Sequence, residues 1–279
     1  MKQKMAKIRV AINGFGRIGR AAFKIITKKP NLEIVAINDL MDTETLSYLL
    51  KYDTVYGRFG AMVEFDQKNL IVNKKKTPIV AEKDPSLLPW KAMKVDVVLE
   101  CTGRFTKDGL ARAHLSAGAK KVIVSAPIKG EGIETFLLGV NDEKYKNQDA
   151  ISNASCTTNC VAPVAWVLHK NFGILKGMMT TVHAYTAEQN LVDGPPPALK
   201  KDLRRARAAA LNIIPTSSGV AEAIKSVIPP LGEVFDGLAL RVPVATGSIS
   251  DFTVLLAKKT TVEEVNYAFL EYAKKHPDI

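Results

Sequence analysis

Cysteine is scarce in this sequence, with three residues in 279. An odd and small number of cysteines does not form a disulfide framework, which excludes the small disulfide-stabilised class and agrees with a reducing compartment. No apolar run is long enough to cross a bilayer, and the short run over 8–12 leads into glycines rather than into a signal-peptide cleavage site. We therefore expect a cytoplasmic protein without a membrane segment. No metal site is predicted.

Negative charge is in deficit, because 28 acidic residues face 39 lysines and arginines, for a formal net charge of +11. An excess of positive charge favours binding to nucleic acid, acidic membranes or small phosphorylated anions. The basic residues are scattered, apart from clusters at 74–76 and 204–207, so a solvated surface explains most of them. Net charge alone does not choose a partner, and we do not expect nucleic acid to be the main one.

The first half of the chain alternates buried strands with helices. Strands are predicted at 8–12, 33–38, 95–100 and 121–125, a hairpin at 61–65 and 69–72, and helices at 20–29, 43–51 and 107–117. The first helix is expected to bury Ala21, Ala22, Ile25 and Ile26. This alternation is typical of a Rossmann-type, doubly wound parallel sheet, so we predict an α/β domain over residues 1–154.

The pattern changes after about residue 150. Helices are predicted at 157–170, 217–227 and 262–275, and longer strands at 175–185, 238–244 and 250–257. Strands grouped apart from helices indicate an α+β domain with a largely antiparallel sheet, over residues 155–279. The stretch 187–203, which contains three consecutive prolines, is expected to be a long loop, and such loops are often functional.

A glycine motif follows the first predicted strand, where residues 14–19 read GFGRIG. The first glycine makes a tight turn, the second lets the backbone approach a pyrophosphate, and the third lets helix pack on strand. Asp39 lies at the end of the second strand, where a carboxylate binds ribose hydroxyls and repels a 2′-phosphate. The alternative is a turn without ligand and an aspartate that caps a helix. The agreement of motif, context and spacing, with Asp39 lying 20 residues beyond Gly19, favours NAD as cofactor, with contacts from Gly14, Phe15, Gly16 and Asp39.

Two further strands end in small polar residues. Thr102 and Gly103 follow the strand over 95–100, and Ser125 ends the strand over 121–125. Doubly wound sheets bind ligands at the carboxyl ends of their strands. These three residues are therefore candidate cofactor contacts.

Cys156 lies in the segment ISNASCTTNC, directly before a predicted helix. At a helix N-terminus the macrodipole favours the thiolate, which is the form that attacks carbonyl carbon. A lone cysteine is more often a small buried residue, but polar neighbours on both sides argue against burial here. Cys160, one helical turn later, and Cys101, at a strand end, are expected to be buried and inert.

His183 lies in a β-prone polar run, TTVHAYT, among only four histidines. A histidine beside a cysteine holds it as an ion pair and then transfers protons. From the pattern alone this pairing is plausible and no more. His114, His169 and His276 lie in helical patterns and are expected to be ordinary surface or helix residues.

Cations and hydroxyls supply a possible anion site. The guanidinium groups of Arg205 and Arg241 match phosphate oxygens in bidentate fashion, whereas Arg204 and Arg207 are expected to form surface salt bridges. Hydroxyl and backbone groups that can add hydrogen bonds are those of Ser155, Thr157, Thr186, Ser218 and Gly219.

Taken together, these segments resemble the phosphorylating glyceraldehyde-3-phosphate dehydrogenases. The matching segments include NGFGRIGR, AINDL, ECTGRF, IVSAP, ISNASCTTNC, TTVHAYT, DLRRARAAA, NIIPTSSG and LRVPV, in family order from residue 7 to about residue 261. The pair ASCTTNC and TTVHAYT is far more specific than the glycine motif.

The resemblance implies a role for each matching residue. Cys156 would add to the aldehyde as a thiohemiacetal, His183 would activate the thiol, hydride would pass to NAD, and inorganic phosphate would release an acyl phosphate from the thioester. Thr186 and Arg241 match the site for the substrate's own phosphate, with Arg205 near it. The family's site for the attacking phosphate is matched by Ser155, Thr157, Ser218 and Gly219. Its cofactor contacts are matched by Arg17, Ile18, Asp39, Lys83 and Ser125.

The sequence also departs from the family pattern. Ser218 stands where a threonine is usual, and Lys83 where bacterial members often carry arginine. Residues 243–250 differ from the commoner proline-asparagine pattern. Family members continue beyond the position of Ile279, so we expect this sequence to be C-terminally incomplete.

Other functions remain open from sequence alone. An erythrose-4-phosphate dehydrogenase would use the same chemistry on an aldehyde longer by one hydroxylated carbon, and an aspartate-semialdehyde dehydrogenase fits the arginines less well. A non-catalytic RNA- or nucleotide-binding protein would use the basic surface and the nucleotide fold. The resemblance implies a homotetramer, in which the loop over 187–203 matches a segment that reaches a neighbouring subunit.

Overall fold

The computed structural model describes residues 6–195, 202–277 and 279. The chain divides into two compact units, Met1–Phe136 with Lys144–Ser155, and Leu137–Glu143 with Cys156–Ile279. Within the described residues no helix is long and apolar enough to cross a membrane. Part of the predicted loop over 187–203, residues 196–201, lies outside the described residues.

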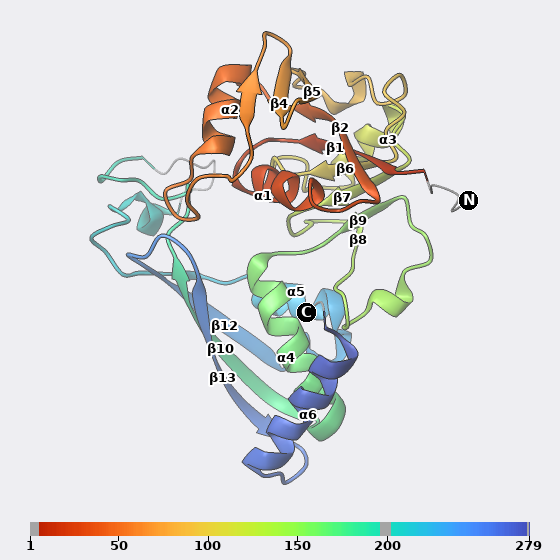
Figure 1. The fold of residues 1–279 in the computed structure, drawn as a ribbon. Coiled ribbons are helices and arrows are strands. Elements are labelled where there is room, and N and C mark those ends of the chain that lie inside the picture. Colours follow the sequence, from red (N-terminus) through yellow and green to blue (C-terminus); the bar gives the residue numbers. More distant parts are fainter. Residues whose placement is uncertain (1–5, 196–201, 278) are drawn as a thin grey trace. The chain divides into compact units, whose positions relative to one another are not determined.

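The first unit is built on a mostly parallel sheet with the strand order β3-β4-β5-β2-β1-β6-β7-β9-β8 (Figure 1). Its strands are β1 (Ile8–Asn13), β2 (Leu32–Asn38), β3 (Val63–Phe65), β4 (Asn69–Val72), β5 (Lys75–Val80), β6 (Val97–Glu100), β7 (Lys121–Val124), β8 (Glu134–Thr135) and β9 (Ala150–Ser152). The β3-β4 hairpin and its β4-β5 extension are antiparallel, and β1 pairs in parallel with both β2 and β6. The order reverses at β1, which makes the junction of β1 and β6 the switch point of a doubly wound fold.

Helices cover both faces of this sheet. They are α1 (Arg17–Ile26), α2 (Thr43–Lys51) and α3 (Ala113–Ser116), with short 3₁₀ helices at Pro85–Leu87 and Leu110–Arg112. Along β1, Val10 and Ile12 join the core cluster of Phe23 and Leu46, whereas Ala11 joins the opposite cluster around Trp90. Alternate residues of a strand point to opposite faces, so a strand buried on both sides is apolar throughout.

Two helix predictions in this unit were partly wrong. In α1 the buried residues are Gly19, Phe23 and Ile26, while Ile25 is 59% exposed, because the large Phe23 ring sets the face that meets the sheet. The helix predicted over 107–117 is only a 3₁₀ turn and the short α3. Lys107 pairs in extended form with Lys129, and Gly109 turns the chain with φ of 72°.

The second unit has a four-stranded mixed sheet in the order β11-β12-β10-β13. Its elements are α4 (Cys156–Phe172), β10 (Ile174–Ala184), β11 (Ile214–Ser217), α5 (Val220–Val227), β12 (Phe235–Val242), β13 (Ser248–Leu256) and α6 (Val262–Lys275), with 3₁₀ turns at Leu203–Ala206 and Pro229–Leu231. A further 3₁₀ turn, Asp142–Lys144, joins the two units along the chain. The pair β10–β12 is parallel, and the pairs β10–β13 and β11–β12 are antiparallel.

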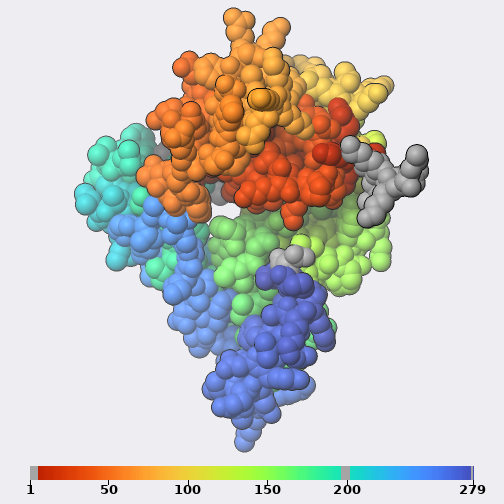
Figure 2. Space-filling model, in the orientation of Figure 1, coloured from red at the N-terminus to blue at the C-terminus, as the bar shows by residue number. Residues whose placement is uncertain are grey.

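Helices α4 and α5 pack on the sheet of the second unit, and α6 packs on α4. Helix α6 begins with a capping box, in which Thr261 and Glu264 satisfy each other's backbone amides. It has no buried residue and lies at the surface of this unit, as Figure 2 shows.

Candidate active site

Cys156 is the first residue of α4 and is exposed. The chain reaches it from β9 through Ala154, which has a left-handed backbone with φ of 56° and donates its amide to Ser152 Oγ. This turn aims the next residues into a helix of 17 residues. The sulfur therefore lies at a helix N-terminus, where the helix dipole favours negative charge.

His183 lies near the end of β10, in register with Arg241 of β12 and Ser248 of β13. Its Nε2 is 3.6 Å from Cys156 Sγ, and its Nδ1 is 2.7 Å from the carbonyl oxygen of Ala184. A carbonyl only accepts, so Nδ1 carries a proton and Nε2 of the neutral ring faces the sulfur as an acceptor. The backbone thus fixes the tautomer that takes a proton from a thiol.

The electrostatics of this pair agree with its geometry. The hydrogen bond with His183 lowers the pKa of the Cys156 thiol to about 7, and burial opposes this shift. In turn, the hydrogen bond with Cys156 raises the pKa of His183 above its ordinary value. Both shifts favour a thiolate–imidazolium pair near neutral pH.

The other two cysteines differ from Cys156. Burial raises the pKa of Cys101 to about 11, which keeps it a thiol. Cys160 was predicted to be buried, and this was wrong: it is exposed, with its sulfur 3.9 Å from Ser250 Oγ. The buried residues that follow it in α4 are Val161, Ala162 and Ala165.

A cationic group lies beside the pair. Arg241 donates from Nη1 to Thr186 Oγ1 at 3.0 Å and to the carbonyl oxygen of Ala184 at 3.3 Å. Burial, and then the positive charge of Arg205, lowers the pKa of Arg241. Arg241 of β12 thus pairs in register with His183 of β10 and bonds Thr186, which lies just beyond the end of β10.

Arg205 is held by its own neighbours. Its guanidinium pairs with Glu188 and donates to Thr216 Oγ1 at 3.0 Å. It is therefore a less available phosphate ligand than Arg241 in this arrangement. Arg204 pairs with Asp202 and Arg207 with Asp193, as predicted for surface salt bridges.

The remaining predicted phosphate contacts lie at two places in the chain. Ser155 and Thr157 flank Cys156, and the Thr157 hydroxyl also interacts with the sulfur. Ser218 follows β11, and Gly219 caps the N-terminus of α5 without a side-chain hydrogen bond. Helix α4, in which Cys156 and Thr157 are the first residues, packs against α5, which Gly219 caps.

The glycine turn of the first unit has the predicted local geometry. Gly14 adopts φ of 90°, and a Cβ there would lie 2.8 Å from the Thr102 side chain. A Cβ on Gly19 would lie 2.1 Å from the carbonyl oxygen of Gly14, whereas a Cβ on Gly16 would meet nothing within 4 Å. The turn is therefore closed toward the protein at Gly14 and Gly19 and open at Gly16, at the N-terminus of α1.

Asp39 is tied to this turn. Its Oδ2 accepts the amide of Phe15 at 2.7 Å, while the Phe15 ring is buried against Phe23. Only the backbone of Phe15 thus faces the turn. Arg20, which the sequence analysis did not single out, donates to the carbonyl oxygen of Phe15 at 2.9 Å. Its signal was its place in the first turn after the motif.

The other predicted cofactor contacts lie at the carboxyl ends of neighbouring parallel strands. Thr102 and Gly103 follow β6, Ser125 follows β7, and Lys83 follows β5. Arg17 and Ile18 begin α1, where Arg17 lies over the ring of Tyr56. All of these residues belong to the first unit and to the sheet edge that carries the glycine turn.

His114 lies in a helix, as predicted, but it is not the ordinary helix or surface residue that was expected. It is fully buried and bonds both Trp90 and Glu100. The apolar neighbours of His114 in the sequence gave no sign of these partners, which come from distant segments. Glu100 and the asparagines Asn13 and Asn38 were also missed, although each is a polar residue at the end of an apolar strand.

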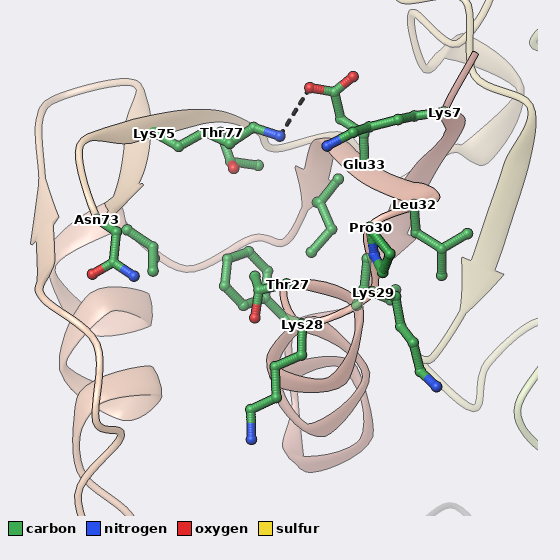
Figure 3. Close-up of a pocket in the computed structure, with 14 residues that line it drawn as sticks. Lys7, Thr27, Lys28, Lys29, Pro30, Leu32, Glu33, Asn73, Lys75 and Thr77 are labelled. Carbon is green, nitrogen blue, oxygen red and sulfur yellow. Dashed lines mark hydrogen bonds and ion pairs between the residues drawn. The ribbon is translucent and has the colours of Figure 1, made fainter. Parts of the chain in front are cut away.

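A cavity of about 320 Å³ lies elsewhere in the first unit. Figure 3 shows its lining from the end of α1, the start of β2 and the β4–β5 turn, with Lys75 paired to Glu33. It is near the amino ends of β1 and β2, opposite to the glycine turn. Doubly wound folds bind ligands at the carboxyl ends, and none of the predicted site residues lines this cavity.

Comparison with known proteins tests the resemblance. Residues 8–108 match the model of the glyceraldehyde 3-phosphate dehydrogenase NAD binding domain, and residues 155–278 match that of the C-terminal domain. The chain belongs to the glyceraldehyde-3-phosphate dehydrogenase family. The first match contains the glycine turn and Asp39, and the second contains Cys156, His183 and Arg241.

Individual members of this family are also similar. The glyceraldehyde-3-phosphate dehydrogenase of Geobacillus stearothermophilus is 54% identical over 94% of this chain and 77% of its own length. That of Clostridium acetobutylicum is 54% identical over 96% of this chain and 79% of its own length, and that of Streptomyces coelicolor is 53% identical over 95% and 79%. An NAD-dependent oxidoreductase acting on an aldehyde group is the class to which these relatives assign the chain.

Proposed function

We propose that this chain oxidises glyceraldehyde 3-phosphate to 1,3-bisphosphoglycerate with NAD and inorganic phosphate, a step of glycolysis and gluconeogenesis. The observation that carries the proposal is the Cys156–His183 pair, with 3.6 Å between Sγ and Nε2 and a thiol pKa of about 7. Family membership and the names of the relatives support the choice of aldehyde.

The residues of the first unit fit NAD. The open side of Gly16 and the N-terminus of α1 suit a pyrophosphate, and Asp39 has a carboxylate beside the turn for ribose hydroxyls. Arg17, Ile18, Lys83, Thr102, Gly103 and Ser125 complete the proposed contacts. When bound, NAD supplies the acceptor for a hydride.

The proposed chemistry begins on the sulfur. His183 takes the thiol proton at Nε2, the thiolate of Cys156 adds to the aldehyde carbon, and His183 returns that proton to the carbonyl oxygen, which gives a thiohemiacetal and a neutral ring. His183 then removes the hydroxyl proton as the carbon loses its hydride, which leaves a thioester on the sulfur. An oxygen of inorganic phosphate attacks the thioester carbon, the carbon–sulfur bond breaks, and acyl phosphate leaves while the thiolate is restored.

The anion contacts divide between two phosphates. Thr186 and Arg241, joined by a hydrogen bond, suit the substrate's own phosphate, with Arg205 as a second charge near them. Ser155, Thr157, Ser218 and Gly219 suit the attacking phosphate, because the first two flank Cys156 and the last two lead into α5, which packs against α4. Guanidinium binds phosphate in bidentate fashion.

Further proposals concern organisation. We propose a cofactor domain over residues 1–154, a catalytic domain over 155–279, a homotetramer and a cytoplasmic location. The scarcity of cysteine supports the last of these. Light scattering during gel filtration measures the assembly, and a stable monomer at micromolar concentration would contradict a tetramer.

The test of the proposed activity is NADH formation from four mixtures. Glyceraldehyde 3-phosphate and erythrose 4-phosphate are each supplied with and without inorganic phosphate. The proposal predicts turnover on the three-carbon aldehyde that requires phosphate. Preference for erythrose 4-phosphate would change the substrate, and the absence of turnover on both aldehydes would refute the activity.

A further inference from the structure

A buried polar row crosses the three central strands of the first unit. Asn38, Asn13 and Glu100 are the last residues of β2, β1 and β6, and they are paired in register. Their exposed fractions are 6%, 1% and 1%. Parallel strands buried on both faces are otherwise apolar, so three adjacent polar ends at the switch point need a physical reason.

Glu100 is the centre of the row. Its Oε1 accepts the amide and the hydroxyl of Thr102, and its Oε2 accepts Asn13 Nδ2 and lies 2.9 Å from His114 Nε2. Among the residues that the structure describes, no lysine or arginine lies within ion-pair distance of this carboxylate. Hydrogen bonds from dipoles therefore satisfy it, and both oxygens are fully occupied.

His114 is the inner end of the row, and its partners fix its protons. Indole Nε1 of Trp90 can only donate, and it lies 3.0 Å from His114 Nδ1. Nδ1 is therefore an acceptor without a proton, so the ring is neutral and donates its Nε2 proton to Glu100. An imidazolium would set two N–H groups against each other, inside a core where His114 and Trp90 are both fully buried.

The Glu100 carboxylate also determines how the side-chain amides of Asn13 and Asn38 are oriented. Because the Glu100 carboxylate only accepts, Asn13 turns its amide NH₂ toward it and its oxygen toward Asn38 Nδ2. Asn38 then accepts the amide of Glu82 at 2.9 Å and donates to the carbonyl oxygen of Glu82 at 2.8 Å. The Glu100 carboxylate on β6 thus fixes the side-chain amide orientations on β1 and β2 and, through Asn38, the backbone contacts of the loop after β5.

Each of the three strand-end residues of the row, Glu100, Asn13 and Asn38, lies next to a loop at the cofactor edge. Glu100 holds Thr102, whose methyl group packs against Gly14. Asn13 directly precedes Gly14, and Asn38 directly precedes Asp39. The Asn38 side chain also bonds the backbone of Glu82, the residue before Lys83. Since all four loops come from the carboxyl ends of adjacent strands, the row lies under the edge where a doubly wound fold binds its ligand.

We propose that Trp90, His114, Glu100, Asn13 and Asn38 form a positioning array that holds the four cofactor loops in their binding geometry. The proposal rests on NAD binding by the first unit, as the proposed function does. A preorganised site loses less entropy when its ligand binds. Loss of an array hydrogen bond therefore weakens NAD binding, although none of these side chains is a catalytic residue.

The test compares His114→Leu with His114→Gln in the full chain. Leucine fills the space but leaves the Trp90 donor unpaired and removes one of the two donors to Glu100 Oε2, whereas glutamine has both a donor and an acceptor. We expect His114→Leu to raise the calorimetric Kd for NAD about tenfold or more, as for one lost hydrogen bond to a charged group. His114→Gln restores most of the affinity. The KM for NAD rises with His114→Leu, while kcat at saturating NAD stays close to that of the unmodified chain.

Val122→Ala is the matched control. Val122 is 1% exposed on β7, in the same core cluster as Trp90, but it has no polar contact with the array. Where Val122→Ala lowers the Tm as much as His114→Leu does, we expect the Kd of Val122→Ala for NAD to stay nearly unchanged. Equal weakening by Val122→Ala, or unchanged affinity in His114→Leu, overturns the proposal.

The proton arrangement is tested separately by ¹⁵N NMR of histidine-labelled chain. The array predicts a neutral His114 ring with its proton on Nε2, and an imidazolium signal or a proton on Nδ1 contradicts it. Failure of the unmodified chain to bind NAD contradicts the array and the proposed function together. An inactive chain that binds NAD and shows the expected Kd pattern contradicts the activity alone.

Discussion

The Nε2 atom of His183 lies 3.6 Å from Cys156 Sγ, while the other ring nitrogen bonds the carbonyl oxygen of Ala184. The second contact decides what the first can do, because it leaves Nε2 without a proton in the neutral ring. A helix N-terminus supplies the sulfur, and a strand end supplies the ring. Neither segment alone makes a reactive thiol.

The pH dependence of thiol alkylation measures this relationship. With a pKa of about 7 in place of the ordinary 9.0, the Cys156 thiolate is half formed near neutral pH, and reactivity rises as pH passes upward through 7. His183→Asn removes the hydrogen bond that is the largest cause of the shift. We expect the midpoint to move toward 9 and the rate at pH 7 to fall between about tenfold and a hundredfold. If the pH midpoint of alkylation does not change in His183→Asn, the N-terminus of α4 and not His183 lowers the pKa of Cys156.

Replacement of the nucleophile separates chemistry from binding. Cys156→Ser is expected to lose aldehyde oxidation by several orders of magnitude, because a hydroxyl is not ionised near neutral pH. NAD affinity stays measurable by calorimetry. Cys160→Ser is the control, since Cys160 lies four residues along the same helix, and it is expected to keep most of the activity. Loss of activity in Cys160→Ser with activity kept in Cys156→Ser would reverse the assignment.

Much of this site could be predicted from the sequence, because short segments determine it. The glycine turn, Asp39 and the start of α4 each depend on a few adjacent residues, and the helices and strands around them were predicted within a few residues. The pairing of Cys156 with His183 joins segments 27 residues apart. Pattern alone left that pairing plausible, and family resemblance made it specific.

The failures share a physical cause. His114 has an apolar helical pattern around it, and only the partners Trp90 and Glu100, 24 and 14 residues away, make its burial tolerable. The exposure of Cys160 depends on which positions of α4 the rest of the unit covers, and these include Val161, Ala162 and Ala165 but not Cys160. Both depend on tertiary contacts, which periodicity in one segment does not contain.

Alanine substitutions at two glycines of the same motif, Gly19 and Gly16, are expected to cause different defects. Gly19→Ala places a Cβ 2.1 Å from the carbonyl oxygen of Gly14, so we expect overpacking to lower the stability of the chain by about 1–3 kcal/mol. Gly16→Ala meets nothing within 4 Å, so stability stays close to that of the unmodified chain while NAD binding weakens. Thermal unfolding and calorimetry measure the two effects. A stable Gly19→Ala chain would contradict the close packing of the turn.

Asp39 has two separable roles. Asp39→Asn keeps an oxygen that can accept the Phe15 amide but removes the charge, so we expect higher tolerance for NADP with the turn intact. Asp39→Ala also removes that acceptor and should weaken both cofactors. The measurement is the ratio of kcat/KM for NADP to that for NAD. If Asp39→Asn leaves this ratio unchanged, Asp39 does not exclude the 2′-phosphate.

Arg241 is expected to act on the substrate's phosphate. Arg241→Lys keeps a charge but loses the fork that reaches Thr186, so the KM for glyceraldehyde 3-phosphate should rise while that for NAD does not. Arg207→Ala, which removes only the surface pair with Asp193, is the control and should leave both KM values unchanged. A larger effect in Arg207→Ala than in Arg241→Lys would contradict this assignment.

The most direct measurement is mass spectrometry of the chain mixed with glyceraldehyde 3-phosphate and NAD without inorganic phosphate. The account predicts an acyl group on the peptide that carries Cys156, attached at that residue and removed when phosphate is added. Acylation at Cys160, or a chain that forms NADH without any covalent acyl group, would contradict it.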